Sequence, residues 1–227
     1  MGTECHLQFT NLSLKAPVYM YYKLNNFYQN HRRWVGFSLT HIDTRYVRSR
    51  SDDQLNGVVI TATNKVPDCA PYASLNDSSD INLLYQPCGL IAHSTFNDSF
   101  ILSSNNGTII PLQKQGIAWP SDLDKFHNQP AGVAGIRVIP DVTDEDFIVW
   151  MRTAALPTFK KLYRVINEDM TGDYTVAVRN RKLPPSLLYS PLDFPVAAYS
   201  GQKAVVFAET NALGGKNPFL GYAYIVV

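Results

Sequence analysis

The chain has 227 residues, of which 45% are hydrophobic and 17% are charged, so it can bury a substantial core as one domain. Its 20 Lys and Arg residues stand against 19 Asp and Glu residues, and no overall positive field would attract polyanions. We therefore exclude a dedicated nucleic-acid-binding protein and expect no nucleic-acid partner.

Several short segments are rich in Val, Ile, Thr and aromatic residues and are separated by clusters of Gly, Pro and Asn, a pattern that predicts β-strands. In chain order these strands are residues 57–63, 135–139, 147–153, 174–178 and 204–209. The alternation within residues 147–153 predicts packing on both faces, which would place this strand centrally. We expect a mainly β fold, an antiparallel β-sandwich-like ectodomain with a few short helices and long loops.

Helical signals are few. Residues 21–33 predict an amphipathic turn or two, with apolar side chains on one side. A second short helix is predicted just after Pro120, where Ser121 and Asp124 have the spacing of a capping box. Residues 180–195 contain four prolines and predict a long irregular excursion.

Two of the three cysteines, Cys69 and Cys88, bracket a short polar loop of a size that a disulfide can close. We interpret this pair as a disulfide and Cys5 as unpaired, with two buried free thiols as the alternative. The bridge would contribute about 2–4 kcal/mol and would persist only in an oxidising compartment.

Four N-x-S/T sequons predict N-linked glycans, and none has proline in the middle position. Each sequon alone is weak, but three of them crowd into residues 76–108. Together with the predicted disulfide they favour a luminal or extracellular face. The candidate glycosylation sites are Asn11, Asn76, Asn97 and Asn106.

The densest group of functional side chains lies in residues 21–33 (YYKLNNFYQNHRR) and 46–55 (YVRSRSDDQL). Its aromatic, amide and cationic groups stack and donate hydrogen bonds but cannot start a covalent reaction, so they indicate recognition. Internal pairing of the arginines with Asp52 and Asp53 is the alternative. The candidate partner-binding residues here are Asn26, Phe27, Tyr28, Asn30, His31, Arg32, Arg33, Arg48 and Arg50.

No catalytic site is predicted. The five histidines are scattered without paired zinc spacing, and no serine lies in a G-x-S-x-G turn, so we expect no metal, cofactor or covalent nucleophile. The Gly214-Gly215-Lys216 triplet is not a phosphate loop, because Thr210 stands where the first glycine is required. The acidic residues 144–146 are interpreted as a solvated turn at a strand entrance rather than a calcium site.

Four further blocks accompany the recognition segments: residues 86–99 (QPCGLIAHSTFNDS), 116–122 (GIAWPSD), 144–163 (DEDFIVWMRTAALPTFKKLY) and 213–227 (LGGKNPFLGYAYIVV). In this order they resemble the cell-division-cycle-fifty or ligand-effect-modulator family, the accessory β subunits of phospholipid flippases. The resemblance covers the chain from about residue 18 onward.

This resemblance implies a noncatalytic subunit that forms a heterodimer with a type IV P-type ATPase and supports its folding, its exit from the endoplasmic reticulum and lipid flipping. The domain would lie on the luminal or extracellular side of the endoplasmic reticulum, Golgi, endosomes or plasma membrane. Lys216 and Asn217 would lie near membrane phospholipids or the partner; a plain glycine turn is the alternative.

The resemblance also divides the chain. Residues 1–221 are expected to form the exoplasmic ectodomain, and residues 222–227 the start of a truncated C-terminal transmembrane helix. Residues 34–45 are an expected insertion relative to the family. A free-standing secreted glycoprotein that binds a glycan or a receptor is the alternative function.

Overall fold

The computed structural model describes residues 4–29, 52–60, 69, 72–179 and 201–209. The strands are β1 (Glu4–Leu14), β2 (Val18–Asn25), β3 (Tyr85–Gln86), β4 (Ser99–Ser104), β5 (Ile136–Arg137), β6 (Phe159–Ile166), β7 (Met170–Arg179) and β8 (Gln202–Glu209). The helices are α1 (Asp52–Leu55), α2 (Leu90–His93), α3 (Pro120–Leu123) and α4 (Glu145–Met151), with 3-10 turns at Leu75–Asp77 and Ile81–Leu83.

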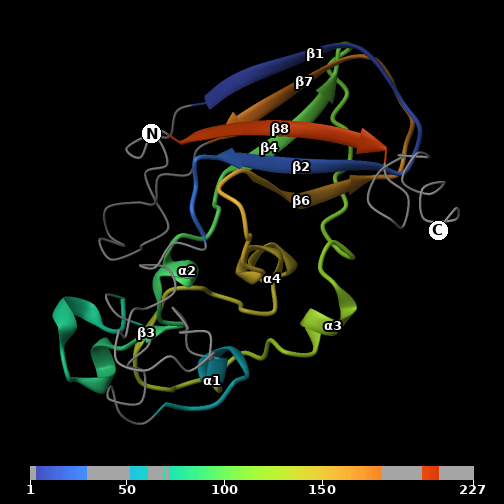
Figure 1. The fold of residues 1–227 in the computed structure, drawn as a ribbon. Helices are drawn as coiled ribbons and strands as arrows, with labels where there is room; N and C mark the ends of the chain where they lie inside the picture. The colour runs from blue at the N-terminus through green and yellow to red at the C-terminus, as the bar shows by residue number, and fades with distance from the viewer. Residues whose placement is uncertain (1–3, 30–51, 61–68, 70–71, 180–200, 210–227) are drawn as a thin grey trace, which may run out of the picture.

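Two three-stranded antiparallel sheets stack on one another (Figure 1), one in the order β1-β7-β4 and the other β6-β2-β8. Aromatic pairs join them across the interface. Phe9 meets Phe207 edge-on with ring centroids 5.0 Å apart, and Phe100 meets Tyr163 at 4.7 Å. Every second side chain of β2 is buried, as expected for a strand with one face on the core.

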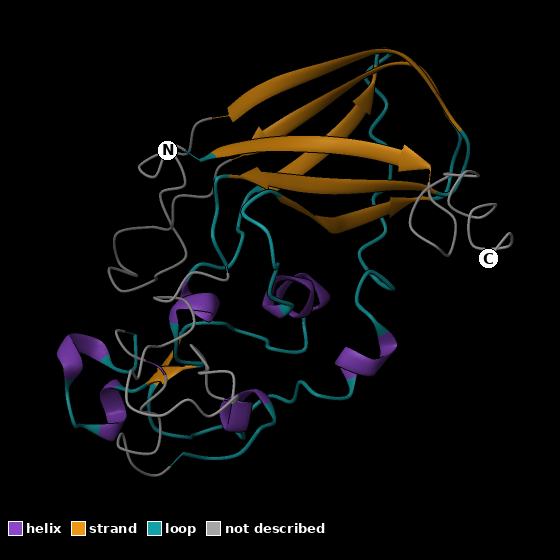
Figure 2. Cartoon of the chain, viewed as in Figure 1, coloured by secondary structure: helices purple, strands orange, loops and turns teal. Residues whose placement is uncertain are grey.

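Strands from the two ends of the chain pair with each other. The first strand, β1, pairs along β7, and β2 lies between β6 and β8 (Figure 1). The helices lie on one side of the sandwich and are joined by long connecting segments (Figure 2).

The helices and the segments that connect them form the helical half of the domain. This half also contains two short strands, β3 and β5, which pair in parallel. Gly135 precedes β5 with a φ of +128°, and a Cβ at this position would lie 2.7 Å from the carbonyl oxygen of Leu84. Only glycine fits such a close backbone approach.

The predicted architecture is confirmed. Residues 174–178 lie within β7, residues 204–209 lie within β8, and residues 135–139 contain the short strand β5. Residues 180–195, 34–45 and 222–227, which carry the predictions of an excursion, an insertion and a membrane helix, lie outside the described residues. Within the described ranges no helix has the length and apolarity that a membrane span needs.

One strand prediction is wrong in kind. Residues 147–153 were expected to form a central strand, but residues 147–151 belong to helix α4. The carboxylate of Asp144 accepts a hydrogen bond from the N–H of Asp146 at 3.0 Å and caps the helix. Capping and tertiary contacts outweigh the β-propensity of the Phe-Ile-Val-Trp sequence.

Other local predictions also need correction. Residues 21–25 belong to β2 rather than to a helical turn, and residues 57–60 form no strand. The predicted short helix is present as α3, but its N-cap is Trp119 and not Ser121. Strands β1, β3, β4 and β6 were not predicted.

Candidate partner-binding site

The described part of the recognition segment continues from the end of β2. Asn26 has a φ of +56°, a left-handed conformation that asparagine tolerates, and it turns the chain out of the sheet. The side chains then alternate: Asn26 and Tyr28 are exposed, Tyr28 to 46%, whereas Phe27 and Gln29 are buried. The segment therefore presents one side to solvent and anchors itself with the other.

The buried side chains tie this segment to the loop that follows α4. The N–H of Phe27 donates to the carbonyl of Pro157 at 2.9 Å, and the amide oxygen of Gln29 accepts from the N–H of Ala154 at 2.9 Å. Gln29 also donates to the carbonyl of Trp150 at 3.5 Å. A buried amide with both ends bonded fixes the position of the loop.

Trp150 is the centre of the packing around this segment. Its side chain is 1% exposed, and its indole N–H donates to the carbonyl of Ile91 in α2 at 2.8 Å. The rings of Phe27 and Tyr22 lie 5.7 and 6.5 Å from it. Trp150 therefore joins the recognition segment, α4 and α2 in one cluster.

A buried lysine holds the C-terminal end of α4. The ammonium of Lys161, on β6, donates to the carbonyls of Val149 at 2.9 Å and Trp150 at 2.7 Å, and also to that of Arg152. Burial, aided by the charge of Arg152, lowers the pKa of Lys161 to about 7. Three carbonyl acceptors favour the protonated amine and act against this effect. Lys161 satisfies helix-end carbonyls that have no partner within the helix.

The acidic run at the start of α4 is half-buried and paired, which corrects its interpretation as a solvated turn at a strand entrance. Glu145 accepts three backbone hydrogen bonds, from Gly116 at 2.9 Å, Ile117 at 2.7 Å and Ala118 at 2.8 Å. Asp144 pairs with Lys114 at 2.6 Å, and Asp146 with Arg164 at 2.5 Å. These carboxylates fix the segment 116–118 beside the helix.

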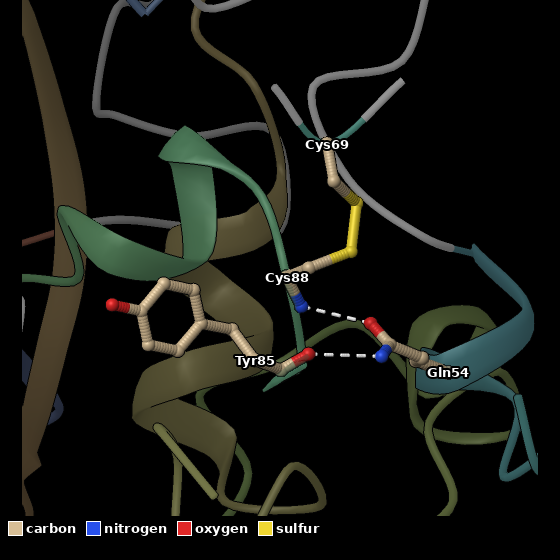
Figure 3. The surroundings of a disulfide bond; sticks show 4 residues. All are labelled: Gln54, Cys69, Tyr85 and Cys88. Carbon is tan, nitrogen blue, oxygen red and sulfur yellow. Dashed lines mark hydrogen bonds between the residues drawn. A yellow bond between two sulfur atoms is a disulfide. The ribbon is translucent and has the colours of Figure 1, made fainter. Parts of the chain in front are cut away.

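Cys69 and Cys88 form a disulfide, and Cys5 is free and exposed on β1. Gln54 bridges the adjacent backbone (Figure 3): it donates to the carbonyl of Tyr85 at 2.9 Å and accepts from the N–H of Cys88 at 2.8 Å. Gln54 is buried, so these bonds replace the water that its amide would otherwise bind. The disulfide and Gln54 together tie α1 to β3 and α2.

His93, at the end of α2, is a buried titratable group. It is 2% exposed and lies between the rings of Tyr72 and Tyr85, with centroids at 4.6 and 4.5 Å. Neither ring nitrogen has a hydrogen-bond partner among the described residues. Burial lowers the pKa of His93 to about 3.

Acid should therefore destabilise the fold through His93. Because the pKa is about 3 in the folded state and about 6.5 in the unfolded chain, the unfolded state binds more protons as the pH falls through this window. We expect a loss of about 2 kcal/mol in the free energy of unfolding between pH 7.5 and pH 5 from this residue. Urea unfolding at the two pH values measures it.

The variant His93→Phe keeps a ring between the tyrosines and removes the titration, so its stability should fall by about 2 kcal/mol less over the same interval. His6→Phe is the control, since His6 is exposed on β1. An equal pH dependence of His93→Phe and the wild type would contradict this role.

The sequons differ in accessibility. Asn11, Asn76 and Asn106 are exposed, and Asn97 is half-buried. Asn11 lies at an irregularity in β1, where its N–H donates to the carboxylate of Asp173 at 2.9 Å. Their glycosylation remains a prediction.

The predicted partner-binding residues separate into three groups. Asn26 and Tyr28 are exposed, whereas Phe27, which stands between them in the sequence, belongs to the core and contributes packing. The others lie outside the described residues: Asn30, His31, Arg32, Arg33, Arg48, Arg50, Lys216 and Asn217.

The polar groups of the site are used mainly to hold backbone. Gln29, Gln54, Glu145 and Lys161 each bond to main-chain atoms of a segment distant in sequence. These hydrogen bonds could not be predicted from the sequence, although Gln29 and Gln54 lie in the two recognition segments. Among the residues that the structure describes, no three His, Cys, Asp or Glu side chains gather as a metal site would require.

The chain matches the model of the LEM3 (ligand-effect modulator 3) family / CDC50 family over residues 1–227. It is 38% identical to "Cell cycle control protein 50A" of Bos taurus over 98% of this chain and 63% of that protein. It is 39% identical to "ALA-interacting subunit 3" of Arabidopsis thaliana over 94% of this chain and 56% of that protein. Human "Cell cycle control protein 50B" is 37% identical over 94% of this chain. The chain thus spans about three fifths of the length of these relatives.

Proposed function

Because the chain belongs to the LEM3/CDC50 family, we propose that it is part of a noncatalytic accessory subunit of a phospholipid-translocating type IV P-type ATPase. The observation that carries this proposal is the family match along the whole chain. The Arabidopsis relatives are named as interacting subunits, which supports a protein partner.

The arrangement of polar side chains supports a binding role. The buried amides, carboxylate and ammonium around α4 position main-chain segments and leave Asn26 and Tyr28 displayed at the surface. Such a preorganised surface lowers the entropy lost when a partner binds. Pump and subunit would form a heterodimer in which the pump hydrolyses ATP and this subunit supports its folding, its exit from the endoplasmic reticulum and lipid flipping.

The compartment follows from the same proposal. Residues 1–221 would lie on the luminal or extracellular side of the endoplasmic reticulum, Golgi, endosomes or plasma membrane. The Cys69–Cys88 disulfide and the exposed Asn11, Asn76 and Asn106 support this side, because disulfides and N-linked glycans form there.

Copurification tests the proposal. The full-length subunit is expressed with candidate type IV P-type ATPases and isolated through a tag, and the pump is quantified in the eluate and in membranes beyond the endoplasmic reticulum. Stoichiometric recovery of one pump, and its retention in the endoplasmic reticulum when the subunit is omitted, are the expected results. Secretion of a glycosylated chain alone, with no pump recovered, would refute the proposal and favour a free-standing binding module.

A further inference from the structure

A groove of about 580 Å³ lies beside the site. One wall is the segment 116–120, the opposite wall is the N-terminal half of β6, and the C-terminal end of α4 closes a third side. Glu145 fixes the first wall through three backbone hydrogen bonds, and Lys161 joins β6 to the end of α4. The groove is therefore formed before any ligand binds.

The wall made by β6 is the edge of its sheet. β6 pairs with β2 on one side, and in the described part of the chain its backbone partner on the other side is Gln113, which exchanges two hydrogen bonds with Val165. The groove lies farther along the strand, at Phe159–Leu162. An extended peptide can add to such an edge through main-chain hydrogen bonds.

The charge of the groove selects for an acidic ligand. Three cations line it (Arg152, Lys160 and Lys161), against the single carboxylate of Asp122. Asp122 lies 3.2 Å from Arg152, and the ammonium of Lys161 is bonded to carbonyls. The exposed Lys160 lies over the ring of Tyr21 at 4.6 Å, so its charge faces the groove without a carboxylate partner among the described residues.

An aromatic side chain stands at the rim. Trp119 is 61% exposed, and the guanidinium of Arg152 lies 5.2 Å from its ring centroid. An exposed indole with a stacked arginine beside a preformed groove has the composition of a protein-binding hot spot.

We propose that this groove binds an extended, acidic segment of the pump, which adds to the free edge of β6 with its carboxylates near Lys160 and Arg152. The choice of the pump as the source of this segment rests on the proposed function. The strand edge favours a peptide over an anionic lipid, because a lipid has no backbone to continue the sheet.

The test uses the full-length subunit coexpressed with its pump. The variant Arg152→Gln/Lys160→Glu should lower the recovered pump by about tenfold or more, because a carboxylate replaces a cation where acidic side chains bind. The control Lys15→Glu/Arg179→Gln makes the same change in charge at exposed positions outside the lining of the groove and should recover pump as the wild type does.

Thermal unfolding shows whether the groove variant keeps its fold. Should it be destabilised, Trp119→Ala provides a second variant of unchanged charge, which should reduce recovery severalfold. If either variant is stably folded and still recovers as much pump as the wild type, the inference is overturned. If such a variant has also lost binding to phosphatidylserine vesicles, the groove is assigned to lipid. Failure of the wild type itself to recover a pump would refute the proposed function.

Discussion

Alanine at Trp150 should lower the free energy of unfolding by about 3–5 kcal/mol, the largest effect expected of any single substitution here. The side chain is 1% exposed and packs against Phe27 and Tyr22, so its removal leaves a cavity among aromatic rings. It also leaves the carbonyl of Ile91 without its donor. Such a loss is a large fraction of the total stability of an ordinary domain, about 5–15 kcal/mol.

The measurement is urea unfolding of the purified protein, monitored by circular dichroism. Trp119→Ala is the matched control, since the same side chain is 61% exposed there and its removal should change stability by about 0.5 kcal/mol or less. Equal effects of the two substitutions would show that Trp150 does not organise the core.

Replacing Cys69 and Cys88 together by serine should lower the free energy of unfolding by about 3 kcal/mol, because the bridge closes a loop with a sequence separation of 19. The two cysteines are buried, so the serine hydroxyls would also need hydrogen-bond partners. Gln54, which bonds to the backbone of Cys88 and Tyr85, would lose its fixed acceptor and donor positions.

Cys5→Ser is the control for this double variant, because Cys5 is free and exposed on β1. Its unfolding midpoint should match that of the wild type, in the presence and in the absence of a reducing agent. The wild type should approach the double variant once reductant is added. If the double variant is as stable as the wild type, the disulfide does not contribute to the free energy of unfolding.

Features carried by short stretches of sequence were predictable. The β-branched and aromatic residues of β7 and β8 revealed those strands, and the position of Cys69 and Cys88 around a polar loop revealed the disulfide. In each case the deciding interaction is local or has few possible partners.

Helix α4 was mistaken for a strand because its stabilising contacts come from elsewhere. The amine that binds its last carbonyls belongs to Lys161, and the indole of Trp150 is held by Ile91, 59 residues away. Strand β1 was missed although Cys5, Leu7 and Phe9 alternate with polar residues. The irregularity between Phe9 and Leu12 interrupts this pattern, and the pairing of β1 depends on β7, far along the chain. Local propensity does not record such long-range partners.

The candidate site shows the same division. Composition marked residues 21–33 as a recognition segment, but it did not show which side chains serve as anchors. Phe27 and Gln29 are buried, and Tyr28 between them is exposed, because the segment leaves β2 and follows the loop after α4. The burial of Lys161 could not be predicted from the sequence, because lysine is rarely buried unless its charge is satisfied.

The pairing of β2 with β8 has a consequence for biosynthesis. Val18 is aligned with Glu209, which is translated 191 positions later. At about 5–20 residues per second, β2 waits roughly 10–40 s after its own synthesis before β8 has been made. β1 waits similarly for β7, which leaves two apolar-faced strands without partners on the nascent chain. The high contact order of this topology makes the domain a slow folder that depends on protection from aggregation while its last strands are made.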